Sequence, residues 1–184
     1  MKNLLRLLIA LATVGLSLSA SAQDAKAGEK KAAMCIGCHG IPDYKASFPE
    51  IYRVPMIAGQ GAKYIASALA QYKKGDRKHP TMRGIAASLS EQDMADLAAF
   101  YSTEAKVDAP PAAPAGTPPA EVAELLKKGN CESCHGKNFS TPIDPTYPKL
   151  AGQHADYLYV ALKEYQTDKN PQVGRNNAIM MGMA

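Results

Sequence analysis

The chain contains the pattern Cys-x-x-Cys-His twice, and glycine follows it each time. The first copy, CIGCHG, spans residues 35–40, and the second, CESCHG, spans residues 131–136. Two thiols one helical turn apart can add to the two vinyl groups of a porphyrin, and the adjacent imidazole then lies under the iron. The sequence therefore predicts two sites of c-type haem attachment.

Each motif would supply two thioether links and one iron ligand. The predicted residues are Cys35, Cys38 and His39 in the first motif, and Cys131, Cys134 and His135 in the second. Disulfides or a redox Cys-x-x-Cys pair would not require the histidine, and a zinc site would need four ligands converging from both pairs. The repeated histidine therefore favours two covalently bound haem c groups over these alternatives.

The similarity between the two halves extends beyond the haem motifs. PMIAGQ at residues 55–60 matches PKLAGQ at residues 148–153, and RKHPTMRGIA at residues 77–86 matches RNNAIMMGMA at residues 175–184. The offset is 96 residues at the cysteines, 93 at the prolines and 98 at the arginines, so the length differences belong in loops. The chain is therefore expected to contain two copies of one domain.

The last match aligns Met82 with Met180. A thioether on the face of the iron opposite the histidine favours the ferrous state, raises the potential and blocks substrate binding. We therefore predict Met82 and Met180 as the sixth ligands. Met181 and Met183 compete with Met180, and simple core packing is the other explanation for these methionines.

Ligation by two histidines is an alternative, because His79 and His154 remain outside the motifs. His79 aligns with Asn177 and His154 aligns with Gly61, so neither has a histidine counterpart in the other copy. We therefore expect both histidines to lie at the surface near the haem edges rather than on iron.

The first 22 residues resemble a secretory signal peptide. Lys2 and Arg6 precede an apolar run at residues 7–18, and residues 20–22 are the small residues Ala-Ser-Ala. We therefore predict cleavage after residue 22, so that the mature chain starts at Gln23 and is exported to the periplasm. The alternative is that this segment is an uncleaved membrane anchor. Loss of the two basic residues lowers the net charge from +4 to +2, too little to indicate a nucleic-acid partner.

The composition between the two copies indicates a linker. Residues 108–119 are rich in proline and alanine, which favours an extended, semi-rigid segment. The predicted organisation is a signal peptide at 1–22, one domain at 23–107, the linker at 108–119 and a second domain at 120–184. Hydrophobic spacing in both domains predicts an all-α fold class with no convincing strand.

Helices are expected on both sides of each haem site. Residues 24–38 and 120–134 can form short helices that end in the motifs, and tyrosines and leucines recur at helical spacing in residues 64–72 and 157–165. Ser90 and Asp93 resemble a capping box, followed by an apolar stripe at positions 94, 97, 98 and 101.

The second copy stops where the first continues into this last helix. No residue follows Ala184, so we expect the second domain to lack its C-terminal helix and the chain to be truncated there. The apolar side of the helix before Cys131 should then lie partly uncovered.

The tandem order of CIGCHG and CESCHG, the two AGQ turns and KGDRKHPTMRGIA at residues 74–86 resemble the cytochrome c4 family of dihaem electron carriers. The resemblance implies two all-helical cytochrome c-like haem domains related by a pseudo-twofold axis, with propionates that face each other across the interface. It also implies that the carbonyls of Pro55 and Pro148 accept hydrogen bonds from the Nδ1–H groups of His39 and His135.

The function that the resemblance implies is periplasmic transfer of single electrons towards a terminal oxidase, without catalysis. Its partners would be redox proteins: a quinol-oxidising complex or a dehydrogenase as donor, and the oxidase as acceptor, with peripheral membrane association compatible with this role. One alternative is the cytochrome subunit of a periplasmic dehydrogenase that oxidises sulfur compounds. A dihaem peroxidase needs one iron with an open or displaceable ligand, against which the matched methionines argue.

Basic residues complete the set of candidates. Arg77 and Arg175 each precede the predicted methionine ligand by five residues and would either pair with propionates or stay solvated. The run of Lys73, Lys74, Arg77 and Lys78 is typical of a solvated face, although an acidic partner could use it for steering.

The duplicated motif generates one direct prediction. Mature protein from an oxidising compartment should carry two haem additions, with all four thiols consumed. Intact-protein mass spectrometry checks this. A mass with four free thiols, or with two disulfides and no haem, would contradict the interpretation.

Overall fold

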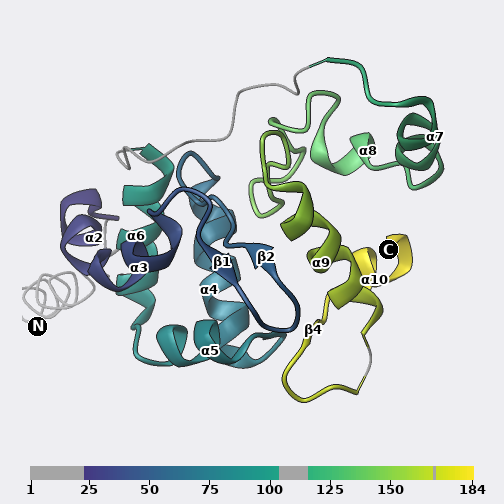
Figure 1. The fold of residues 1–184 in the computed structure, drawn as a ribbon. Helices are drawn as coiled ribbons and strands as arrows, with labels where there is room; N and C mark the ends of the chain where they lie inside the picture. Colours follow the sequence, from purple (N-terminus) through teal and green to yellow (C-terminus); the bar gives the residue numbers. More distant parts are fainter. Residues whose placement is uncertain (1–22, 104–115, 168) are drawn as a thin grey trace, which may run out of the picture.

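A computed structural model describes residues 23–103, 116–167 and 169–184 of the chain (Figure 1). The predicted signal peptide at 1–22 and most of the predicted linker lie outside the described residues. Residues 23–103 form one helical unit and residues 116–184 contribute to a second, and the two lie side by side.

The first unit consists of helices with one short strand pair. Its helices are α2 (Ala25–Lys31), α3 (Ala33–His39), α4 (Ala62–Lys74), α5 (Pro80–Ala87) and α6 (Glu91–Thr103), and its pair is β1 (Lys45–Ala46) with β2 (Tyr52–Arg53). Helix α6 packs against both α2 and α4, which places the first haem motif, on α3, beside the core.

The helix predicted at 24–38 is divided in two. Ala32 is fully buried, and its N–H donates to the Glu29 carbonyl three residues earlier at 3.1 Å. This tight turn, of the 3₁₀ type, separates α2 from α3. The break lets α2 follow α6 while α3 carries the motif.

Helix α2 approaches α6 closely at Gly28. A Cβ atom built there would lie 2.1 Å from the Asp96 carbonyl oxygen, so only glycine allows this backbone contact. The Asp96 side chain, which is almost fully buried, accepts hydrogen bonds from the Asp24 N–H at 3.0 Å and from Lys31 Nζ at 2.9 Å. These bonds tie the two helices together at the point of closest approach.

Helix α6 begins at the predicted capping box and buries the predicted stripe. The Ser90 N–H donates to Asp93 Oδ2 at 2.8 Å, and the Asp93 N–H donates to Ser90 Oγ at 3.1 Å. The stripe residues Met94, Leu97, Ala98 and Tyr101 are all buried. They pack with Ile65 and Leu69 of α4 and form the core of the first unit.

The second unit repeats the order of helices up to the second methionine region, but its described residues contain no counterpart of β1–β2. Its helices are α7 (Ala120–Lys128), α8 (Glu132–His135), α9 (Ala155–Gln166) and α10 (Ala178–Met183). The helix predicted at 120–134 is interrupted at residues 129–131, where Asn130 has a left-handed φ of 48°. The second motif therefore lies on a separate short helix, as the first does.

The apolar side of α7 is exposed, in agreement with the expectation for the helix before Cys131. Leu125 is 66% exposed and Val122 is 43% exposed, and α7 contains no buried residue. In the first unit, the equivalent helix α2 lies against α6.

The expectation of no strands was wrong, although the fold is predominantly helical. Besides β1–β2, the strands β3 (Arg77–Lys78) and β4 (Gly174–Arg175) pair antiparallel, with Arg77 opposite Arg175. Two-residue strands are too short to produce an alternating hydrophobic pattern, so the sequence carried no sign of them. The β3–β4 pair is important because it joins the two units directly.

Ion pairs also cross between the units. Arg53 on β2 donates from its backbone N–H to Asp156 Oδ2 at 3.0 Å and from its side-chain Nε to the same oxygen at 3.1 Å. Lys163 Nζ lies 2.6 Å from Glu50 Oε1. The two units therefore form one packed assembly.

Gly28→Ala should lower the free energy of unfolding by about 1–3 kcal/mol, because the added methyl group would force α2 away from α6. Gly84→Ala, in α5, is the matched control, because nothing lies within 4 Å of its added Cβ except its chain neighbours and the nearby backbone of α5 itself. There we expect a gain of about 0.5–1 kcal/mol from helix propensity. Denaturant unfolding of the holoprotein measures both, and equal stability of the two variants would contradict this packing.

Candidate functional site

The first motif is organised by a hydrogen bond from its histidine to a proline carbonyl. His39, the last residue of α3, donates from Nδ1 to the Pro55 carbonyl oxygen at 2.8 Å. Burial lowers the pKa of His39, against the opposing effect of this hydrogen bond, so the ring is neutral near pH 7. Its Nε2 is then left to bind a metal.

The second motif has the same arrangement. His135, the last residue of α8, is only 7% exposed and donates from Nδ1 to the Pro148 carbonyl oxygen at 3.0 Å. Both predicted proline contacts are therefore confirmed. Such a bond selects the ring tautomer and fixes its orientation, which a metal ligand requires.

The motif cysteines lie beside their histidines with their thiols free. Cys35 and Cys38 lie on α3, Cys131 caps the N-terminus of α8, and Cys134 precedes His135. All four are partly exposed and none is in a disulfide. The geometry leaves each thiol accessible for thioether formation.

A large cavity joins the two motifs. Its volume is about 1410 Å³, and residues of both units line it. The motif residues and predicted ligands in its wall are Cys35, Cys38, His39, Met82, Cys131, Cys134, His135 and Met180. The structure thus brings all eight predicted site residues to one continuous space.

The two predicted methionine ligands lie on short helices that begin in the same way. The Met82 N–H on α5 donates to Nδ1 of His79, the residue before the helix, at 3.4 Å. The Met180 N–H on α10 donates to Oδ1 of Asn177 at 3.0 Å. His79 and Asn177 are aligned in sequence, so the matched caps support the pairing of Met82 with Met180.

The competing methionines differ in position. Met183 also lines the cavity, but its side chain is 57% exposed. Met181 is 45% exposed and is not among the lining residues. Met180 is partly buried, and the cavity therefore favours it, with Met183 as the remaining alternative.

His79 is partly exposed and lines the cavity, in agreement with the expected position near a haem edge, but its ring also makes contacts within the protein. Its Nδ1 caps α5, its Nε2 lies 3.1 Å from the Tyr52 hydroxyl, and its ring packs edge-on against Phe48. Both ring nitrogens are thus engaged within the protein. His154 precedes α9 and does not line the cavity, so the geometry supports neither histidine as an iron ligand.

Both arginines are buried, which excludes the solvated alternative and leaves pairing with propionates as the remaining prediction. Arg77 is 6% exposed and Arg175 is 7% exposed, and both line the cavity. The basic run at residues 73–78 is therefore not one solvated face, because Arg77 points inward. The cause is the β3–β4 pair, which places this side chain between the two units.

Two glutamines, for which the sequence predicted no role, make hydrogen bonds between the two units next to the haem motifs. Gln60 brackets the backbone of Lys149: its Nε2 donates to the Lys149 carbonyl at 3.0 Å, and its Oε1 accepts from the Lys149 N–H at 2.8 Å. Gln153 brackets Met56 in the same way, at 2.9 and 3.1 Å. The repeated AGQ turns were the signal that could have found them.

These glutamines connect the two units at the proline carbonyls that accept the histidine hydrogen bonds. Lys149 follows Pro148, and Met56 follows Pro55. Each unit's glutamine therefore holds the backbone next to the carbonyl that orients the other unit's histidine.

One buried polar atom also points to a bound group. The Tyr101 hydroxyl is buried and makes no hydrogen bond within the described part of the chain, and the polar group that interacts with it is the thiol of Cys35, one of the predicted haem-attachment residues. Tyr101 also lines the cavity beside the first motif. An unpaired buried hydroxyl is costly in free energy, so its partner is expected in the cavity. The motif thiols, the two imidazoles oriented by proline carbonyls and this hydroxyl fit a covalently attached haem.

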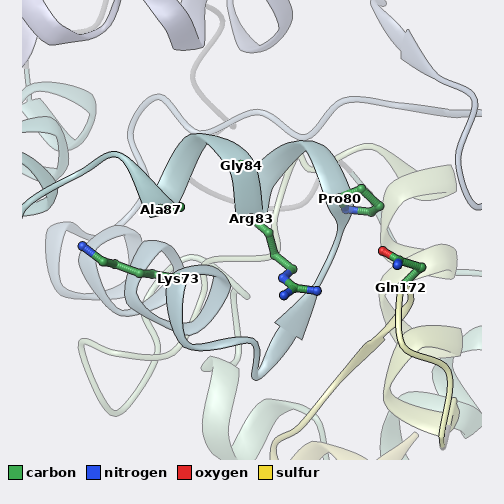
Figure 2. A pocket seen from close by; sticks show the side chains of 6 residues that line it. All are labelled: Lys73, Pro80, Arg83, Gly84, Ala87 and Gln172. Atoms are coloured by element: carbon green, nitrogen blue, oxygen red, sulfur yellow. The ribbon is translucent and has the colours of Figure 1, made fainter.

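A second, smaller pocket lies outside this site. It has a volume of about 380 Å³, and its lining residues are Lys73, Pro80, Arg83, Gly84, Ala87 and Gln172 (Figure 2). None belongs to a haem motif, and none is a predicted ligand.

Comparisons with known proteins place the chain in a family. The cytochrome c family model matches it twice, at residues 25–103 and 119–184. Cytochrome c4 of Azotobacter vinelandii is 33% identical, over 100% of this chain and 90% of that protein. The chain belongs to the cytochrome c4 family. The crystal structure of reduced recombinant cytochrome c4 from Pseudomonas stutzeri aligns with a TM-score of 0.57 and 28% identity, over 88% of this chain and 90% of that one.

A further relative has a more specific description. A thiosulfate dehydrogenase electron acceptor of Stutzerimonas stutzeri is 32% identical, over 92% of this chain and 84% of that protein.

Membership in the cytochrome c4 family confirms several sequence predictions. The chain is a dihaem electron carrier with two tandem, predominantly helical cytochrome c domains and two covalently bound haem c groups. Its partners are redox proteins. Within the described residues, no helix is both long and apolar enough to cross a bilayer.

The site generates a prediction about the methionines. Met82→Ala and Met180→Ala should each remove about half of the thioether-to-iron absorption band and lower one of the two potentials, because each would remove one of two sulfur ligands. Met183→Ala is the matched control and should leave the band unchanged. Visible spectroscopy with redox titration distinguishes the three variants, and loss of half the band in Met183→Ala instead of Met180→Ala would transfer the ligand role.

Proposed function

We propose that this member of the cytochrome c4 family is a periplasmic, non-catalytic carrier that passes single electrons between respiratory components, towards a terminal oxidase. The observation that supports it best is the pair of imidazoles, each oriented by a proline carbonyl at 2.8 or 3.0 Å and each facing one shared cavity. Two haem sites that share one cavity would lie close enough together for electrons to pass between them.

The proposed ligands follow from this arrangement. Cys35 and Cys38, and Cys131 and Cys134, would hold the two haems by thioether bonds. His39 with Met82, and His135 with Met180, would bind the two irons. When bound, the haems supply one-electron redox chemistry at both sites.

The protein's own residues would keep both sites rigid and closed. The proline carbonyls fix the imidazoles, and the caps at His79 and Asn177 fix the start of each methionine helix. A sixth ligand on each iron leaves no position for a substrate, which argues against a dihaem peroxidase. This is the basis for proposing a carrier and not an enzyme.

The periplasmic location is proposed from the predicted signal peptide at 1–22 and from the attachment motifs. The proposed donor is a quinol-oxidising complex or a dehydrogenase. Peripheral association with the membrane is compatible with a carrier that exchanges electrons with membrane complexes.

A second candidate is a dedicated electron acceptor for a dehydrogenase of sulfur compounds. It is supported by the Stutzerimonas stutzeri relative described as an acceptor for thiosulfate dehydrogenase. The same two haem sites would serve either role, so the partner decides between them.

We expect the reduced mature protein to be reoxidised by membranes that contain a terminal oxidase, and cyanide should block this reaction. The ferric protein should be reduced by a quinol-oxidising complex, and stopped-flow absorbance follows both reactions. The matched comparison replaces the complex with thiosulfate dehydrogenase and thiosulfate. Rapid reduction only in that mixture, without reoxidation by the membranes, would favour the second candidate.

A further inference from the structure

The AGQ glutamines exchange hydrogen bonds between the domains in a reciprocal pattern. Gln60 Oε1 in the first domain accepts from the Lys149 N–H in the second at 2.8 Å. Gln153 Oε1 in the second domain accepts from the Met56 N–H in the first at 3.1 Å. Each side-chain amide also donates from Nε2 to the carbonyl of the same residue, so each glutamine fixes one backbone segment of the other domain.

The N–H groups that these glutamines bind belong to the peptide units that orient the motif histidines. The Met56 N–H and the Pro55 carbonyl lie in one peptide unit, which is planar. The carbonyl of this unit accepts from His39 Nδ1 at 2.8 Å. Gln153 and His39 therefore bind the two ends of the same rigid group.

The second domain contains the same series of contacts with the roles exchanged. The Lys149 N–H shares a planar peptide unit with the Pro148 carbonyl, which accepts from His135 Nδ1 at 3.0 Å. Gln60 of the first domain and His135 therefore bind opposite ends of this unit. Hydrogen bonds arranged in series polarise one another, so a bond made at the N–H strengthens the carbonyl as an acceptor.

Within its own domain each glutamine side chain has a different contact, farther from the histidine acceptor. Gln60 Oε1 also accepts from the Gly61 N–H, and Gln153 Oε1 accepts from the His154 N–H, both at 3.0 Å. These two N–H groups lie six residues beyond the proline of the same domain. The shortest hydrogen-bonded link from each glutamine to an imidazole is therefore the one that crosses the interface.

We propose that Gln60 positions His135 and that Gln153 positions His39, so that each domain controls the iron ligand of the other. The inference rests on the proposed histidine ligands. An imidazole whose Nδ1–H has a strong acceptor is a more basic ligand, and a more basic ligand favours ferric over ferrous iron. Loss of either glutamine should therefore raise the potential of the haem in the other domain.

Gln60→Leu and Gln153→Leu test the proposal, because leucine can neither accept from the backbone N–H nor donate to the carbonyl. Redox titration by visible spectroscopy gives both potentials. Proton NMR assigns each haem by its contacts to Tyr101 in the first domain or to Tyr147 in the second. At a fixed potential, the ratio of reduced to oxidised iron should rise about three- to tenfold, the effect of one lost hydrogen bond, at the second haem in Gln60→Leu and at the first haem in Gln153→Leu.

Amide hydrogen exchange gives a readout that does not depend on the iron. The Lys149 N–H should exchange faster in Gln60→Leu, because it loses its acceptor across the interface. The Met56 N–H should exchange faster in Gln153→Leu for the same reason. These measurements show whether each variant has lost the intended bond.

Lys163→Ala is the matched control, because it removes the ion pair with Glu50, which also crosses the interface but involves no residue of the cavity lining. It should leave both potentials unchanged. A larger shift at the haem of the glutamine's own domain, equal shifts of both haems, or no shift in the leucine variants would overturn the proposal.

Gln60→Asn and Gln153→Asn keep the amide but shorten its reach by one methylene group. They should give the same crossed pattern of shifts, so the proposal is also tested if a leucine variant does not fold. A ligand other than His39 or His135 on either iron of the unmutated protein would instead contradict the proposed function.

Discussion

The structure depends on the hydrogen bond between each motif histidine and its proline carbonyl. A covalent haem motif alone fixes where the imidazole starts, but not the rotation of its ring. The carbonyls of Pro55 and Pro148 supply that constraint. Because Gln60 and Gln153 bind the backbone of the residues that follow these prolines, the constraint is shared between the domains. The interface and the two iron sites are therefore parts of one arrangement.

The same interface buries charges that would be costly elsewhere. Arg77 and Arg175 each satisfy Nε with a side-chain oxygen and one Nη with a tyrosine hydroxyl. Only Glu164 neutralises one of the two charges, so the cluster keeps a net positive charge at the cavity. This surplus of positive charge would suit haem propionates, since anionic groups compensate buried guanidinium groups.

The helix that precedes the haem motif is packed differently in the two domains. In the first, Gly28 allows α2 to contact α6, and the buried stripe of α6 completes the core. In the second, α7 has no buried residue, and Leu125 is largely exposed. The β3–β4 pair and the Arg53–Asp156 ion pair hold this second unit against the first.

Much of this could be predicted from the sequence, because local patterns carry it. The Cys-x-x-Cys-His spacing indicated covalent haem, the repeat indicated two domains, and the capping box at Ser90 and Asp93 indicated the start of α6. The burial of Arg77 and the reciprocal roles of Gln60 and Gln153 were decided only by tertiary structure. Each depends on a partner about 90 or more residues away. No local pattern records such contacts, since they arise only when the two repeats pack against each other.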